Sequence, residues 1–292
     1  MPGIYPVNPF YPEETGAFRH ELKLLCSAQD MRIVRSRLQN LLPYDSHAGE
    51  NGQYAIRSLY FDDYDDSCLR ENEAGVDNRR KYRIRLYNGS ADRLQLEIKR
   101  KRHGMTQKLS CLLTREQCEA LMRGRCPPFL EPLSPRLREE YWGVSAARPR
   151  EEQKKAEAAL LPSEEEREAA RRQAPLRELC LMMKTRLMRP VVIVEYQRTA
   201  YTYPAGNVRI TLDEHIGASS RISRFLDPSV PMTPLLPAGQ HVLEVKYDEF
   251  LPDALARTLQ LGRLRVTTFS KYALGRQRAP IPLTQWKAGN DR

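Results

Sequence analysis

The chain lacks the sequence signatures of several common enzyme classes. It has no Cys-x-x-Cys pair, and its six cysteines and five histidines are not spaced as metal ligands. It also has no Gly-x-x-x-x-Gly-Lys loop, no Gly-x-Gly-x-x-Gly fingerprint and no Ser-His-Asp signature. The usual zinc, P-loop, dinucleotide and serine-nucleophile interpretations therefore have no support in the sequence.

Membrane and secretion signals are missing as well. No apolar run approaches the roughly 20 residues that a membrane-spanning helix needs. Met1–Pro12 has neither the basic start nor the apolar stretch of a signal peptide. Scattered cysteines are typical of reduced thiols, so we expect a cytoplasmic protein without a membrane span.

Acidic residues are in the minority. The 292 residues include 47 Lys and Arg against 37 Asp and Glu, which gives a net charge of +10. This excess favours anionic partners, of which nucleic acid is the commonest. Hydrophobic residues make up 41% of the chain, enough for a globular core of normal size.

Charged side chains recur at every second position in several segments that otherwise resemble β-strands. Because side chains alternate along a strand, the charged residues of one segment share a face and the apolar residues share the other. The charged faces carry Glu21 and Lys23; Arg83 and Arg85; Gln95, Glu97 and Lys99; Arg209, Thr211 and Asp213; and Glu244 and Lys246.

The pattern predicts an α+β fold, a closed antiparallel β-barrel with helices packed outside it. Strands are expected at 17–26, 54–61, 81–87, 94–100, 108–113, 190–200, 207–212 and 241–247. Helices are expected at about 27–42, 67–74, 251–261 and 269–274, and from a capping box at 114–117.

The chain reads as one large domain with flexible additions. We expect an N-terminal arm at 1–16, the barrel domain at 17–275 and a tail at 276–292. A charged helical insert interrupts the domain at about 135–180, and its part at 148–173 is rich in Glu, Arg, Lys and Ala. We assign this insert no catalytic role.

If the apolar strand faces pack on the helices, the charged faces line the interior of the barrel. Uncompensated charges there would cost several kcal/mol each, so water, other charges or a ligand must compensate them. A phosphate chain suits such an interior, because arginine offers paired donors and lysine offers point charges to phosphate oxygens.

The carboxylates on these faces allow two interpretations. Glu97, Asp213 and Glu244 have little use in a nucleic-acid groove, but a phosphoryl-transfer site uses carboxylates to hold a divalent metal. The alternative is that a glutamate serves as the salt-bridge partner of Lys99 or Lys246.

Seven motifs in sequence order resemble the VTC domain, the catalytic module of polyphosphate polymerases within the triphosphate tunnel metalloenzyme superfamily. The motifs lie at 19–23 (Arg-His-Glu-Leu-Lys), 82–85 (Tyr-Arg-Ile-Arg), 96–99 (Leu-Glu-Ile-Lys), 196–200 (Tyr-Gln-Arg-Thr-Ala), 209–213 (Arg-Ile-Thr-Leu-Asp), 243–246 (Leu-Glu-Val-Lys) and 269–272 (Phe-Ser-Lys-Tyr). Together they cover about 17–275.

The resemblance implies a site residue by residue. The catalytic cations would be Lys23, Arg83, Arg85, Lys99 and Arg198. Further substrate- and phosphate-binding residues would be Glu21, Glu97, Lys108, Arg209, Lys246, Ser270 and Lys271. Glu244 would bind the metal, Mn²⁺ or Mg²⁺.

The implied activity is metal-dependent transfer of the γ-phosphoryl group of ATP to a growing polyphosphate chain, primed by inorganic phosphate or pyrophosphate. Two alternatives use the same tunnel: a triphosphatase, and a non-catalytic module that binds polyphosphate or nucleotide. Tunnel phosphatases generally begin with Glu-x-Glu-x-Lys, whereas Arg19 stands first here, which favours the polymerase. We expect no nucleic-acid partner, because no aromatic residues are interleaved with the arginines.

Overall fold

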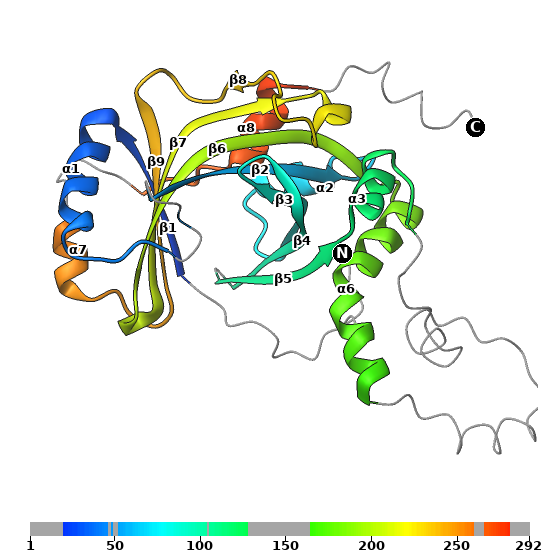
Figure 1. Ribbon diagram of the computed structural model, residues 1–292, viewed down its shortest axis with the longest axis horizontal. Helices are drawn as coiled ribbons and strands as arrows, with labels where there is room; N and C mark the ends of the chain where they lie inside the picture. Colours follow the sequence, from blue (N-terminus) through cyan, green and yellow to red (C-terminus); the bar gives the residue numbers. More distant parts are fainter. Residues whose placement is uncertain are drawn as a thin grey trace, which may run out of the picture.

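One curved antiparallel sheet organises the chain (Figure 1). The computed structural model describes residues 20–45, 48, 52–103, 105–127, 164–259 and 266–280. Within them, strands pair in the order β1-β9-β7-β6-β2-β3-β4-β5, and the short β8 pairs with β7. The strands are β1 (His20–Ser27), β2 (Gln53–Asp62), β3 (Arg79–Tyr87), β4 (Ser90–Arg102), β5 (Met105–Leu113), β6 (Arg189–Tyr203), β7 (Val208–Ser219), β8 (Thr233–Pro234) and β9 (Gln240–Tyr247). The predicted antiparallel α+β class is confirmed.

Helices accompany the sheet in the same described residues. They are α1 (Ala28–Gln39), α2 (Ser67–Glu73), α3 (Arg115–Met122), α6 (Glu164–Thr185), α7 (Asp253–Leu259) and α8 (Lys271–Arg278), with short 3-10 helices η1 (Ala205–Asn207) and η2 (Ile222–Arg224). A capping box begins α3, where the side chains of Thr114 and Gln117 each accept a hydrogen bond from the other residue's backbone N–H. This predicted cap is confirmed.

The helices cover the apolar face of the sheet. α1 and α7 lie together beside β1 and β9, whereas α3 and α6 pack near β4 (Figure 1). Two apolar clusters result: Leu38 of α1 packs with Ile210 and Leu243, and Leu179 of α6 belongs to the larger cluster with Ile84. Burying one face in this way leaves the charged face turned inward, as the alternation predicted.

The second half of α6 belongs to the core. Leu176, Leu179 and Met183 are buried, whereas Glu168 and Arg172 are exposed. The charged composition of 148–173 therefore does not extend into this half of the helix. The spacing of the three apolar residues makes a stripe along one helix face, and this stripe packs on β4 and β5.

Parts of the predicted organisation lie outside the described residues. These are the arm at 1–16, the beginning of the first predicted strand with Arg19, the part of the insert before residue 164, and the tail beyond 280. In the part of the chain that the structure describes, no helix is long and apolar enough to cross a membrane.

The two ends of the sheet, β1 and β5, are not joined by backbone hydrogen bonds in the described residues, so the closed barrel is not confirmed. The free edge of β1 is occupied instead by the segment before α8. Thr267 donates its backbone N–H to the Lys23 carbonyl at 2.8 Å, and Leu24 forms a bridge with Val266. A side-chain contact spans the remaining gap, since Lys99 Nζ on β4 lies 2.6 Å from Glu21 on β1.

Candidate functional site

A cavity of about 390 Å³ lies against the charged face of the sheet. Among the described residues, ten lysines and arginines line it, together with two carboxylates. The lining residues are Glu21, Lys23, Tyr60, Lys81, Arg83, Arg85, Lys99, Thr106, Lys108, Tyr196, Arg198, Arg209, Glu244, Lys246, Ser270, Lys271 and Tyr272. All the predicted site residues are therefore brought together here, except Glu97, which lies beneath the cavity wall.

Glu97 is fully buried and holds the arginines of β3. Its carboxylate lies 2.6 Å from Arg83 Nη2 and 3.6 Å from Arg85 Nη1, and Lys108 Nζ approaches it at 3.4 Å. Burial would raise the pKa of Glu97, but the three cations outweigh it and keep the pKa well below its usual range. The ionised carboxylate thus fixes the direction of both guanidinium groups.

Asp213 on β7 does the same for Arg198 on β6. It is fully buried, and it accepts two parallel hydrogen bonds of 2.6 and 2.7 Å from Arg198. Lys271 Nζ, at the start of α8, lies 2.6 Å from the same carboxylate. Strand alternation placed Asp213 on a charged face as a possible metal-binding carboxylate, and in the structure it binds two cations.

Glu21 and Glu244 alternate with lysines on β1 and β9. The register puts Glu21 opposite Lys246 and Lys23 opposite Glu244. Lys246 Nζ lies 2.5 Å from Glu244, and Lys23 Nζ lies 2.9 Å from Glu21. Burial raises the pKa of each carboxyl, but the surrounding lysines lower it by more than burial raises it. Both carboxyls are therefore ionised. The salt-bridge interpretation is therefore correct for Glu244 and Lys246.

The surroundings of Glu244 also fit a divalent metal ion. Thr211 faces Glu244 across the β7–β9 pair, and its buried Oγ1 has no hydrogen-bond partner among the described residues. Carboxylate and hydroxyl oxygens are the hard donors that Mg²⁺ and Mn²⁺ prefer. In the described part of the chain, no three His, Cys, Asp or Glu residues are grouped so that they could hold a metal ion by themselves. Such an ion would therefore need phosphate or water oxygens as further ligands.

Several lining residues were missed from the sequence. Lys81 was missed because it precedes the motif at 82–85. It is two residues before Arg83, so it shares the strand face of Arg83 and Arg85, and this alternation could have identified it. Tyr60 and Tyr196 were missed because a strand tyrosine is usually a core residue. Here their rings lie beside cations: Arg198 Cζ is 5.1 Å from the Tyr196 ring centre, and Lys271 Nζ is 4.8 Å from it.

The start of α8 reaches the cavity because Asp62 anchors the helix. Tyr272 donates its hydroxyl hydrogen to Asp62, and Arg276 pairs with the same carboxylate at 3.5 Å. Asp62 also accepts the backbone N–H groups of Cys68 and Leu69 at the start of α2. This fully buried aspartate therefore ties both helices to the end of β2 and sets the position of Lys271.

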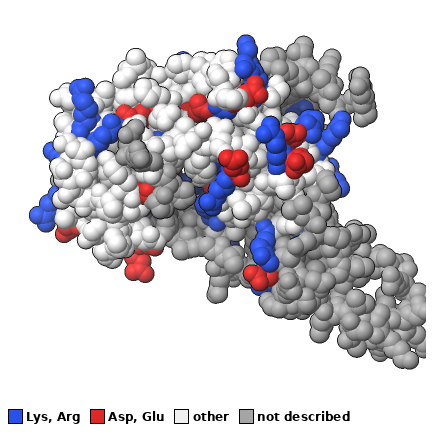
Figure 2. Space-filling model, in the orientation of Figure 1, with Lys and Arg blue, Asp and Glu red and all other residues white. Residues whose placement is uncertain are grey.

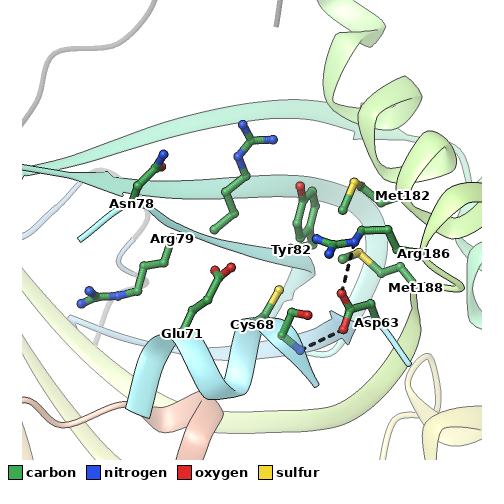
Figure 3. A pocket seen from close by; sticks show the side chains of 11 residues that line it. Asp63, Cys68, Glu71, Asn78, Arg79, Tyr82, Met182, Arg186 and Met188 are labelled. Carbon is green, nitrogen blue, oxygen red and sulfur yellow. Dashed lines mark hydrogen bonds and ion pairs between the residues drawn. The ribbon is translucent and has the colours of Figure 1, made fainter. Parts of the chain in front are cut away.

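A second pocket, of about 220 Å³, lies on the other face of β3 (Figure 3). Its apolar lining residues are Cys68, Tyr82, Met182 and Met188. Asp63 at its edge accepts the Ser67 backbone N–H at 2.8 Å and pairs with Arg186 at 3.7 Å. Tyr82 and Arg83 point to opposite faces, so the strand itself separates this pocket from the basic cavity.

Comparisons with known proteins identify the family. The family model of the VTC domain matches residues 18–279. No curated protein matches the chain. Among solved structures, the chain is similar to a putative adenylyl cyclase from Hippeastrum with a dominant triphosphatase activity. The TM-score is 0.42 at 12% identity, and the match covers 91% of this chain and 98% of the Hippeastrum chain. A putative adenylate cyclase from Bacillus halodurans has a TM-score of 0.39 and 14% identity, covering 84% and 87%. These scores are too low to carry an argument, but the family model matches most of the chain, so the chain belongs to the VTC domain family.

Proposed function

We propose that the chain is a metal-dependent phosphotransferase that moves the γ-phosphoryl group of ATP onto phosphate, pyrophosphate or a growing polyphosphate chain. One observation carries the proposal: ten cationic side chains and only two carboxylates line a single cavity. We also propose that the sheet encloses a tunnel, as the resemblance implies, and that the protein acts in the cytoplasm, as the lack of membrane and secretion signals led us to expect.

The excess of cations in the cavity favours a ligand with several negative charges. Burial lowers the pKa of Lys99 to about 8, with Lys23 and Lys246 acting in the same direction against Glu21. Burial and its cationic neighbours also hold the pKa of Lys81 well below its usual range. A polyphosphate would relieve this repulsion, because each phosphate brings negative charge and strong hydrogen-bond acceptors.

A nucleic-acid site is less well supported. Such a site needs cations on an accessible surface that follows the backbone of the nucleic acid. Here Arg85 and Arg198 are 8% and 4% exposed within the cavity. On the face drawn in Figure 2, basic and acidic side chains are interspersed.

The proposed chemistry needs no nucleophilic side chain, because the acceptor is a phosphate oxygen. Catalysis then depends on position and charge. Arg83 is held by the buried carboxylate of Glu97 and Arg198 by that of Asp213, so both present fixed donors to a phosphoryl group between them without reorganising. Glu244, with Thr211 beside it, would hold Mg²⁺ or Mn²⁺, which neutralises phosphate charge when it is bound.

The test is to incubate the purified chain with ATP and Mn²⁺ or Mg²⁺ and to separate the products on a gel that resolves polyphosphate. We expect a ladder with the wild type and none with Glu244→Gln. Glu249→Gln is the matched control, since Glu249 is exposed and does not line the cavity. Phosphate without a ladder would show a triphosphatase, and binding without turnover would show a module that only holds its ligand.

A further inference from the structure

Three lysines form a row across neighbouring strands at one side of the cavity. Lys81 lies opposite Lys99 in the β3–β4 pair, and Lys99 lies opposite Lys108 in the β4–β5 pair. All three side chains line the cavity. Like charges directly opposite each other destabilise an antiparallel pair, so the row has a cost to the fold that a function must explain.

The row is poorly compensated by carboxylates. Lys99 contacts Glu21 at 2.6 Å, but Glu21 is shared with Lys23. Lys108 approaches Glu97 only at 3.4 Å, and Glu97 already holds the two arginines of β3. Each available carboxylate therefore serves more than one cation.

Lys81 has no carboxylate within 4 Å among the described residues. Its ammonium group donates to Ser270 Oγ at 3.1 Å and lies 5.7 Å from the centre of the Tyr272 ring. Both partners belong to the start of α8, and both are neutral. Because an ammonium group has three donors, Lys81 keeps hydrogen-bonding capacity for a ligand.

The lysine row differs in kind from the arginine centre. Arg83 and Arg198 are fixed by carboxylates at 2.6 Å, which suits a phosphoryl group that must be held in one geometry. A lysine offers a point charge on a flexible stem and tolerates many positions of its partner. A chain of identical phosphates that moves as it grows needs contacts of the second kind.

We propose that the row formed by Lys81, Lys99 and Lys108 binds interior phosphates of the polyphosphate chain, away from the phosphoryl group being transferred. The ligand is a linear polyphosphate longer than three phosphates. Lys81 is then a chain-binding residue that determines how long a product the enzyme retains. This inference rests on the proposed function, since it assigns one part of the same cavity.

The test compares long polyphosphate with inorganic triphosphate as ligands of Lys81→Gln. We expect affinity for the long chain to fall about tenfold or more, the value of one charged hydrogen bond, while affinity for triphosphate changes less than about twofold. Lys184→Gln is the control, because Lys184 is exposed on α6 and lies outside the cavity. Circular dichroism and a melting curve confirm that each variant folds.

Products of the turnover reaction give a second, independent readout. Chains made by Lys81→Gln should be shorter than wild-type chains at equal ATP consumption. An equal loss of affinity for long polyphosphate and for triphosphate would mean that Lys81 binds the phosphoryl group being transferred. Unchanged affinity and product length would mean that Lys81 does not bind the ligand. Either result overturns the inference. If the wild type binds long chains through Lys81 yet turns over nothing, the proposed function fails while the chain-binding row stands.

Discussion

The buried carboxylate of Asp213 binds the guanidinium group of Arg198 through two parallel hydrogen bonds, of 2.6 and 2.7 Å. Paired bonds of this kind fix the plane of the guanidinium as well as its distance. Glu97 on β4 holds Arg83 on β3 in a comparable way. The cations of the cavity are thus directed by carboxylates that the ligand itself would not touch.

Asp213→Asn should separate binding from turnover. The variant removes a negative charge, so polyphosphate binding should be kept or strengthened, whereas turnover should fall about a hundredfold because Arg198 loses its fixed direction. Kinetics at saturating ATP and titration with polyphosphate measure the two effects. Asp65→Asn, at an exposed aspartate outside the cavity, should change neither. Loss of binding in step with turnover would contradict a positioning role.

Asp62→Ala should destabilise the fold and displace the start of α8. The substitution leaves buried backbone N–H groups and the Tyr272 hydroxyl without their acceptor, at about 1–3 kcal/mol for each group. We expect the free energy of unfolding to fall by about 3 kcal/mol or more in urea denaturation, with Asp65→Ala near the wild-type value. A change of under about 0.5 kcal/mol would show that Asp62 is not the anchor.

Much of the site followed from strand alternation, and the reasons for the failures are physical. Arg83, Arg85 and Lys99 could be placed on one face because a period of two is local to each strand. The sequence of a single strand does not determine which segment pairs with the edge of the sheet. The segment at 266–267 takes the free edge of β1, and nothing in the sequence of β1 or β5 indicates this competition.

The remaining misses have a similar origin. Asp213 and Tyr196 both lie beside Lys271, which is distant from them in sequence, so their roles become visible only when α8 packs on the sheet. The charged helical insert predicted at about 135–180 includes most of α6, whose first half is charged. Its apolar stripe at 176–183 was short enough to be overlooked beside that composition.

Polyphosphate binding should weaken as the pH rises above neutrality. The pKa of Lys99 is lowered to about 8 in the free protein, chiefly by burial, and a bound polyanion would raise it. Below pH 8 the lysine is already charged and affinity is at its full value. Above pH 8 binding must take up a proton, so affinity falls until the pH passes the pKa of the complex.

Titrations of polyphosphate at pH 7 and pH 9 measure this effect. The wild type should bind polyphosphate more weakly at pH 9 than at pH 7. Lys99→Gln should bind more weakly than the wild type at pH 7, and its affinity should fall less between pH 7 and pH 9. An equal pH dependence in both proteins would show that another group titrates. Calorimetry in two buffers of different ionisation enthalpy should detect proton uptake near pH 8.5 in the wild type.

Removal of divalent metal should stop turnover but leave the chain bound. Lysines and arginines supply most of the charge in the cavity, so polyphosphate should still raise the melting temperature in the presence of EDTA. Adding back Mn²⁺ or Mg²⁺ should restore turnover in the wild type and not in Glu244→Gln. Full activity in EDTA would contradict a metal-dependent reaction.

The most direct measurement follows the fate of the γ-phosphoryl group. ATP labelled at the γ position is incubated with the chain, Mn²⁺ and a polyphosphate primer, and the label in polymer and in free phosphate is counted over time. Phosphoryl transfer inside the basic cavity predicts that most of the label enters polymer, in chains that lengthen with time. Label that appears only as free phosphate, with primer length unchanged, would contradict it.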